Sequence, residues 1–192
     1  MRVFIAVLVL IFSLQSWTKA DDIRDFQIEG MSIGDSLLDY FEKKLINDSL
    51  ATYYNDDKIS TTRIASDNYE NYNQLDLSFI TKDKSYKIIA ISAALFSRNI
   101  PEGCKMKSKE IKNIIEETLD KNIYVYEEKT AVHPVDASGK STVDSKYYYF
   151  KNGDAIAIQC YNFSKETDYT SALKLQVAKE VHILWLSNEA YK

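Results

Sequence analysis

Apolar residues recur at helical spacing in two stretches of the chain. Residues 37, 38, 41 and 45 of the first stretch are Leu, Leu, Phe and Leu. Residues 111, 114, 115 and 119 of the second stretch are Ile, Ile, Ile and Leu. Positions three and four apart lie on one side of an α-helix, so each stretch predicts an amphipathic helix with one face for a sheet to cover.

Alternating apolar and polar residues follow each predicted helix. Residues 75–80 and 86–93 alternate around a polar turn, which predicts a hairpin. Residues 146–150 and 155–161 predict a second hairpin, joined at Asn152 and Gly153, a pair that tolerates the positive φ angles of a type I′ turn. We place Tyr124 and Tyr126 on a neighbouring strand, residues 173–177 on a further strand and residues 181–186 in a short closing helix.

The order of these elements indicates an α+β protein built from two similar halves. After a leader at residues 1–20, a first helix and antiparallel sheet occupy residues 21–100, and a second helix and sheet occupy residues 101–192. The two helical patterns open near Gly30 and Gly103, which gives a weak internal repeat of about 70 residues. Pro101 and Gly103 break regular structure between the halves. No Gly- or Ser-rich linker separates them, so we expect the halves to pack as one body.

The first 20 residues have the pattern of a secretory signal peptide. Arg2 precedes an apolar run, and the small residues Thr18 and Ala20 precede a cleavage point. The apolar run has about ten residues, half of what a helix needs to cross a bilayer. No later run is long and apolar enough for a membrane span. We therefore expect a periplasmic or secreted protein without a membrane anchor.

The chain has two cysteines, Cys104 and Cys160. In an exported protein, two cysteines are most simply explained by one disulfide formed in an oxidising compartment. The alternative is a reactive free thiol. A bridge that closes a loop of this length stabilises the fold by about 4 kcal/mol in the chain-entropy description.

Charge and composition argue against several classes of function. With 24 basic and 28 acidic residues, the net charge of −4 leaves no excess of positive charge for the phosphate backbone of a nucleic acid. His133 and His182 are the two histidines, and together with two cysteines they are too few for a zinc site of the usual type. We therefore expect no nucleic-acid partner, no metal and no cofactor.

The sequence GDSL at residues 34–37 resembles the nucleophile motif of the GDSL hydrolases. That resemblance implies that Ser36 attacks an ester and that a histidine arrives from an Asp-x-x-His motif. Neither histidine follows an aspartate at that spacing, and Glu29 and Gly30 interrupt the strand that should precede the motif. Gly, Asp and Ser also begin helices, so we favour a helix N-terminus and keep hydrolysis through Ser36 as the alternative.

Residues 132–140 hold the most concentrated polar chemistry of the chain. They include His133, Asp136 and Lys140 in a segment that is longer than a tight turn. Long loops on rigid scaffolds often carry binding residues, which makes these three candidate binding residues and a solvated loop the alternative. The overlapping SGKST at 138–142 resembles the end of a phosphate-binding P-loop. It lacks the first Gly and the following helix of that motif, which favours a polar turn.

Tyrosine is frequent, with 14 residues in the chain. Tyr147 and Tyr149 share one face of a strand and Tyr148 points to the other, so one of the two faces must belong to the core. A tyrosine combines a large apolar ring with a polar hydroxyl, which suits the recognition of proteins or sugars. Tyr147 and Tyr149 are therefore candidate binding residues, and ordinary sheet packing is the alternative.

The sequence IEGMSIGDSLLDY at residues 28–40 resembles the opening of a family of small exported bacterial proteins. Further matches lie at 133–134 (HP), 138–142 (SGKST), 153–155 (GDA), 160–161 (CY) and 189–192 (EAYK), so the resemblance covers most of the mature chain. It implies export and no particular activity.

At the level of organisation only, the repeated plan of a helix followed by an antiparallel sheet is similar to two groups of proteins. These are the tandem-repeat β-lactamase inhibitor proteins and the small outer-membrane assembly lipoproteins. The similarity implies a binding module with a concave, aromatic-rich sheet face, although the lipid-attachment cysteine of the lipoproteins is missing from this sequence.

These observations favour a non-catalytic binding or interaction module of the periplasm. We expect its partner to be another envelope or extracellular protein, or a small ligand, bound through the sheet or a loop. The alternative is a GDSL-like serine ester hydrolase that uses Ser36.

Overall fold

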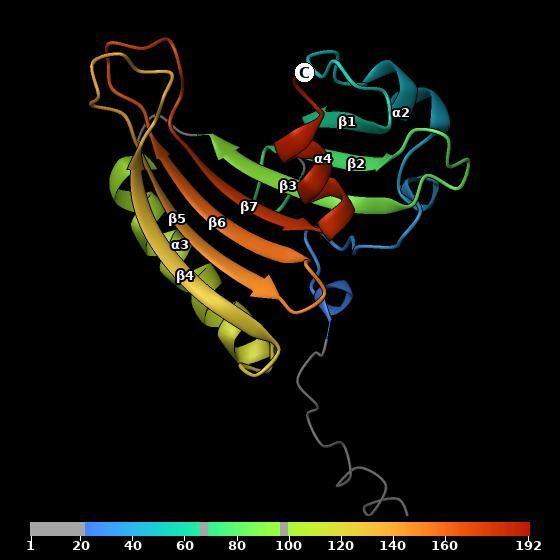
Figure 1. The fold of residues 1–192 in the computed structure, drawn as a ribbon, viewed down its shortest axis with the longest axis horizontal. Helices are drawn as coiled ribbons and strands as arrows, with labels where there is room; N and C mark the ends of the chain where they lie inside the picture. Colours follow the sequence, from blue (N-terminus) through green and yellow to red (C-terminus); the bar gives the residue numbers. More distant parts are fainter. Residues whose placement is uncertain (1–21, 66–68, 97–99) are drawn as a thin grey trace, which may run out of the picture.

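The structure is a computed structural model that describes residues 22–65, 69–96 and 100–192. Its centre is one antiparallel sheet of seven strands in the order β1-β2-β3-β7-β6-β5-β4 (Figure 1). The predicted leader lies outside the described residues. The strands are β1 (Ile59–Ala65), β2 (Gln74–Ile80), β3 (Ile88–Phe96), β4 (Tyr124–Val132), β5 (Thr142–Phe150), β6 (Ala155–Asn162) and β7 (Ala172–Ala178).

Helices lie on both faces of the sheet. The long helix α3 (Ile100–Thr118) packs on β6 and β7, and α4 (Glu180–Asn188) packs on the opposite face against β3. In Figure 1, α3 lies behind the strands and α4 lies in front of them. The short helices are η1 (Ile23–Asp25), η2 (Leu37–Asp39) and α2 (Lys43–Asp48). Within the described ranges, no helix is long and apolar enough to cross a membrane.

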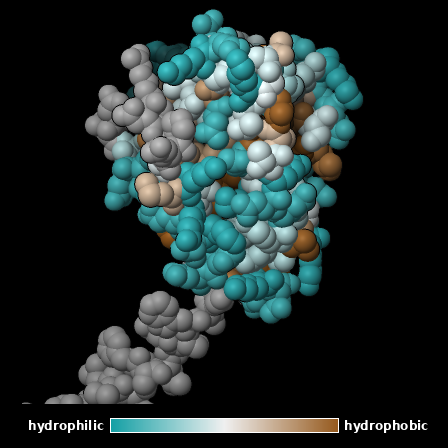
Figure 2. All heavy atoms as spheres, turned by 90° about the vertical axis from the view of Figure 1, so that its left-hand side faces the viewer, coloured by the Kyte–Doolittle hydropathy of each residue, from teal (hydrophilic) through white to brown (hydrophobic). Residues whose placement is uncertain are grey.

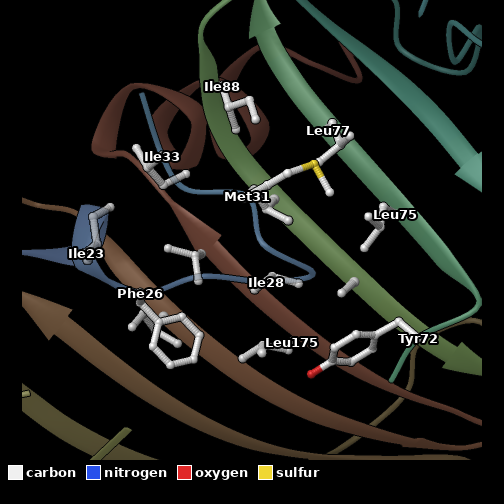
Figure 3. Close-up of a cluster of buried hydrophobic side chains, with 14 of the residues drawn as sticks. Ile23, Phe26, Ile28, Met31, Ile33, Tyr72, Leu75, Leu77, Ile88 and Leu175 are labelled. Carbon is white, nitrogen blue, oxygen red and sulfur yellow. The ribbon is translucent and has the colours of Figure 1, made fainter. Parts of the chain in front are cut away.

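The sheet face under α3 holds the main hydrophobic core. Alternate residues of the central strands, such as Ile91, Ile156 and Val177, are buried on this face. The N-terminal segment crosses the same face and completes the core beside α3. Figure 3 shows its apolar side chains packed with those of the sheet: Ile23, Phe26, Ile28, Met31 and Ile33 lie with Leu75, Leu77, Ile88 and Leu175.

The first predicted helix is wrong in its extent. Residues 37–48 form only η2 and the short helix α2, and Leu38 and Leu45 are 43% and 44% exposed. The sheet is covered instead by the extended segment before them, which pairs with the start of β3 through Gly34 and Ser36. The first half therefore lacks the long helix that precedes the strands of the second half. The structure does not show the predicted repeat.

The turn between β5 and β6 also differs from the predicted type I′ turn. Gly153 has a φ of +85°, while Asn152 is not among the residues with positive φ. The N–H of Gly153 donates to the carbonyl of Phe150 at 3.0 Å, and Phe150 N donates to the carbonyl of Asp154 at 2.9 Å. This is a longer loop that needs a positive φ at the glycine alone.

The predicted break of regular structure at Pro101 and Gly103 is wrong, because α3 begins at Ile100 and contains both residues. Several other predictions are confirmed. The chain is an α+β protein, both hairpins form, and α3, β7 and α4 lie where the sequence pattern placed them. Cys104 of α3 and Cys160 of β6 form the predicted disulfide, with 5.9 Å between their Cα atoms. The disulfide attaches α3 to the centre of the sheet.

The two predicted halves contribute to one continuous sheet. Strands β1 to β3 belong to residues 21–100 and strands β4 to β7 to residues 101–192. The two groups join where β3 pairs with β7, from Ala90 opposite Ala178 to Phe96 opposite Ala172. The join lies in the middle of the sheet, so surfaces of both halves meet on each of its faces.

Candidate functional site

The sheet face opposite α3 is polar across its central strands. Alternation places every second residue of each strand on this face, and the strand register aligns these residues in rows. We call the surface formed by two such rows the polar face. One row contains Tyr147, Ala157, Gln176, Ser92, Asp76 and Arg63, and the other contains Ser145, Gln159, Lys174, Ala94 and Gln74.

A hollow of about 620 Å³ lies on the polar face. Its floor is formed by short side chains of β3, such as Ala90 and Ser92, which leave the space above the sheet open. Larger side chains surround the floor: Tyr161 from β6, Tyr54 from the segment before β1, and residues of α4. The hollow thus contains residues from both predicted halves.

The α4 wall of the hollow is held by contacts to the segment that precedes β1. The indole N–H of Trp185 donates to Asp56 Oδ1 at 2.7 Å, and Asn55 N donates to the carbonyl of Ala190 at 2.8 Å. The ring of Trp185 is buried and lies 4.8 Å from the ring of Tyr54 in an edge-on arrangement. These contacts fix α4 against the sheet.

Arg63 and Asp76 form a two-bond ion pair at the β1 side of the hollow. Arg63 Nε donates to Asp76 Oδ1 at 2.8 Å and Arg63 Nη2 donates to Oδ2 at 2.7 Å. The guanidinium also donates to the hydroxyl of Tyr53 and lies 5.3 Å from its ring centre. Since bidentate pairing satisfies both charges, this pair is neutral toward a ligand.

Gln159 links the tyrosines at the other side of the hollow. Its amide nitrogen donates to the hydroxyl of Tyr147 at 3.2 Å, and its amide oxygen accepts a hydrogen bond from the hydroxyl of Tyr161 at 3.1 Å. Both tyrosine rings are thereby held in fixed positions around the hollow.

Lys174 lies between these two groups on the central strand β7. Its side chain is half-buried, and Nζ lies 5.1 Å from the ring centre of Tyr161. Over the described ranges, the ammonium group forms no ion pair and no hydrogen bond. Burial lowers the pKa of Lys174 from its usual value, an effect that nearby Asp76 partly opposes.

A second hollow, of about 440 Å³, adjoins the first and shares Lys174 and Tyr161 with it. It is lined by a series of stacked rings. Tyr161 and Phe163 lie 6.1 Å apart, and Phe163 and Tyr169 lie 5.1 Å apart. Together, the two hollows place a polar chamber and a flat aromatic surface on opposite sides of one lysine.

His182 of α4 lines the first hollow from above. The residue is buried, and its Nδ1 atom has no hydrogen-bond partner in the part of the chain that the structure describes. Burial lowers the pKa of His182 to about 4, so the imidazole is neutral at neutral pH.

Comparisons of the chain with protein-family models, curated proteins and solved structures give no significant match. The function must therefore be argued from the geometry of the polar face. Across the described residues, no group of three or more His, Cys, Asp or Glu side chains is placed to hold a metal ion.

The structure brings Tyr147 and Tyr149 together. Their rings stack with 5.5 Å between centres on the same sheet face as the hollow, and Tyr147 lines it. Tyr148 points the other way and is fully buried in the core, as the alternation predicts. His133 lies beside the second hollow, with its ring 4.9 Å from that of Phe163.

Asp136 and Lys140 are engaged within the protein. Asp136 is buried and accepts hydrogen bonds from the backbone and hydroxyl groups of Ser138 and Ser141 and from the hydroxyl of Ser164. These bonds, those of Ser138 first, hold the pKa of Asp136 well below its usual range. Lys140 pairs with Glu166. The contacts of both residues support a role in ordering the two loops beside the second hollow.

The hydroxyl of Ser36 has local partners. It donates to the carbonyl of Ser85 at 2.7 Å and accepts a hydrogen bond from Leu38 N, which caps η2. Asp35 accepts hydrogen bonds from Ser32 N and the hydroxyl of Tyr40. Within the described ranges, neither histidine forms a hydrogen bond with Ser36. The geometry agrees with the helix N-terminus that the sequence favours.

The sequence interpretation missed Arg63, Asp76, Gln159, Lys174 and Gln176. Four of them alternate with buried apolar residues on their strands, as Lys174 and Gln176 do with Leu173, Leu175 and Val177. Arg63 lies between the buried residues Thr62 and Ile64. This alternation indicates that they point away from the core. It does not predict that they converge, because convergence depends on the pairing of β3 with β7.

Proposed function

We propose that the protein is a non-catalytic binding protein of the periplasm or the extracellular medium, and that it holds a small polar ligand on the polar face. The observation that carries this proposal is the hollow of about 620 Å³, in which polar side chains surround a floor of small residues. Pockets of a few hundred to a thousand Å³ with a few oriented polar groups are typical of small-molecule sites. The disulfide agrees with an oxidising compartment.

The form of the surface favours a small ligand over a protein partner. The α4 wall and the Tyr161 wall enclose the hollow on two sides, which limits what can enter. Figure 2 shows the side of the molecule at the left of Figure 1, where the coloured residues are mainly hydrophilic and hydrophobic atoms form small separate spots. The coloured residues of this side, which adjoins the polar face, form no broad apolar patch of the kind that obligate protein interfaces have.

The resemblance to small exported proteins remains a second source of support for export. The similarity to β-lactamase inhibitor proteins depends on the predicted repeat, which the structure does not show. A bound protein is the outcome that would replace our proposal. Hydrolysis through Ser36 is not part of the proposal, because its hydroxyl partners among the described residues are backbone groups of Ser85 and Leu38, which cannot act as a base.

The proposal is tested by filling the hollow. Ser92→Phe places a large ring on its floor, while Ala131→Phe places the same ring on the exposed edge strand β4 as a matched control. Thermal unfolding of the mature protein is measured with a panel of sugars, organic acids and amino acids at millimolar concentration. A ligand that binds only the folded state raises the melting temperature.

We expect at least one compound to stabilise the wild type and Ala131→Phe but not Ser92→Phe. Equal stabilisation of Ser92→Phe would place the binding site elsewhere. If no compound of the panel stabilises the wild type, the small-ligand proposal fails and a protein partner becomes the better explanation.

A further inference from the structure

The charges around the hollow are not balanced. Among its lining residues, Arg63 is neutralised by its two-bond pair with Asp76, and His182 is neutral at neutral pH. Lys174 is then the remaining charged group of the lining, and it has no carboxylate partner among the described residues. The polar face therefore carries one positive charge at its centre.

Neutral hydrogen-bonding groups lie in the neighbouring row of the polar face, on one side of this ammonium group. Gln176 follows Lys174 on the same face of β7, about 7 Å along the strand, and Ser92 lies opposite Gln176 on β3. In the described structure, the side chains of Gln176 and Ser92 form no hydrogen bonds. The amide of Gln176 and the hydroxyl of Ser92 are thus free to donate to an oxygen placed beside Lys174.

The surroundings of Lys174 also limit the shape of a ligand. On one side lies the aromatic surface of Tyr161, Phe163 and Tyr169, which suits a flat ring. On the other side lies the polar hollow. Asp168 is a further lining residue of the second hollow, but it is exposed and forms no ion pair with Lys174.

We infer that the ligand is a small organic carboxylate that carries a ring, with its carboxylate between Lys174 and the adjacent pair Gln176 and Ser92, and its ring against Tyr161. The inference rests on the proposed function and names the chemistry of its ligand. A carboxylate supplies the single negative charge that the lining lacks, and its oxygens can accept hydrogen bonds from these neutral donors. Sugar acids and aromatic acids both have this chemistry.

The test compares each acid with its neutral amide of almost the same shape. D-glucuronate with D-glucuronamide represents the sugar acids, and benzoate with benzamide represents the aromatic acids. Titration calorimetry on the mature, oxidised protein gives the affinity ratio of acid to amide in each pair. We expect a ratio of at least about tenfold in one pair, since a charge-assisted bond is lost in the amide.

Two matched variants assign this ratio to Lys174. Lys174→Gln removes the central charge, and Lys129→Gln removes a lysine at the edge of the same face, which lies 5.3 Å from the ring centre of Tyr147. We expect Lys174→Gln to lower the ratio to about one while the amide still binds, and Lys129→Gln to leave the ratio unchanged.

The outcomes separate this inference from the proposed function. If the amide binds as well as the acid, or if Lys174→Gln retains the preference, the inference is overturned while binding in the hollow stands. If neither acid binds but the panel reveals another ligand that Ser92→Phe excludes, the inference alone fails. If Ser92→Phe binds every ligand as well as the wild type does, both the inference and the proposed function fail.

Discussion

Lys174 brings an ammonium group to the middle of a seven-stranded sheet, and none of the described residues pairs a carboxylate with it. A half-buried charge without a partner costs stability, because it loses part of its hydration and gains no ion pair in return. The tyrosine ring beneath it offsets only part of that loss. The position of such a residue is better explained by binding than by folding.

This explanation predicts that Lys174 can be replaced without loss of stability. Lys174→Met keeps most of the unbranched side chain and removes the charge, so we expect the free energy of unfolding in urea to stay the same or to rise by up to about 1 kcal/mol. Lys129→Met on the edge strand serves as the control. A loss of more than about 1 kcal/mol in Lys174→Met alone would show that the lysine is needed for the fold.

His182 predicts a pH dependence of stability. Its pKa is about 4 in the folded protein and about 6.5 in an exposed histidine. As the pH falls, the unfolded chain therefore binds a proton at His182 near pH 6.5, whereas the folded protein binds it only near pH 4. Stability contributed by the neutral imidazole is therefore present at pH 7 and is lost as the pH falls toward 4, by up to about 3 kcal/mol.

The free energy of unfolding at pH 7 and at pH 4.5 checks this in the wild type, His182→Gln and His133→Gln. We expect the decrease between the two pH values to be clearly smaller in His182→Gln and unchanged in His133→Gln. Carboxylates that titrate near pH 4 contribute equally to all three proteins. The same decrease in all three would show that His182 does not remain neutral in the folded state.

At the scale of elements, hydrophobic periodicity predicted some segments well, but the equally periodic residues 37–45 did not form the expected helix. Helix α3 and both hairpins follow from the spacing of apolar residues. The strand β1 was missed because its central residues Thr61 and Thr62 read as polar, although both are buried. Their hydroxyls are satisfied by Ser78 and by the carbonyl of Ile46. The apolar residues of the N-terminal segment have no regular spacing, because contacts with the sheet face that it covers determine its conformation.

Alanine substitution should have opposite effects at two glycines, one in the turn between β5 and β6 and one in α3. Gly153 has a φ of +85° and its Cβ would meet the side chain of Glu180, so Gly153→Ala should lower the free energy of unfolding by about 1 to 2 kcal/mol. Gly103 lies within α3 with open space around it, and Gly103→Ala should raise it by about 0.5 to 1 kcal/mol. Urea unfolding measures both, and effects of equal sign would contradict the backbone assignment.

The disulfide gives the largest expected effect of any single element. Cys104 and Cys160 are 56 residues apart, and opening a loop of that length by Cys104→Ala with Cys160→Ala should cost about 4 kcal/mol. The unfolding of the double variant is compared with that of the oxidised wild type. A loss below about 1 kcal/mol would mean that the contacts of α3 with β6 and β7 hold the helix without the covalent bond.

At the scale of the whole molecule, the site depends on how the two halves join. The sequence placed Tyr147 and Tyr149 on a candidate binding face, and both lie on the face that carries the hollow. It also proposed His133, Asp136 and Lys140 as binding residues. His133 lies beside the second hollow. Asp136 and Lys140 instead bond to Ser164 and Glu166 of another loop. Arg63 and Lys174 are 111 positions apart in sequence, and only the β3–β7 pairing puts them around one hollow.

The account is tested most directly by mapping ligand contacts on the ¹⁵N-labelled mature protein by NMR while D-glucuronate or benzoate is added. We predict that at least one of these acids causes shift changes that centre on Ser92, Gln159, Lys174 and Gln176, with smaller changes at Tyr161 and Phe163. Changes confined to other regions, such as the groove that Ile80, Val181 and Leu184 line between α4 and β2, would contradict the assignment of the polar face as the site for a ring-bearing carboxylate. The absence of changes with either acid would contradict it as well.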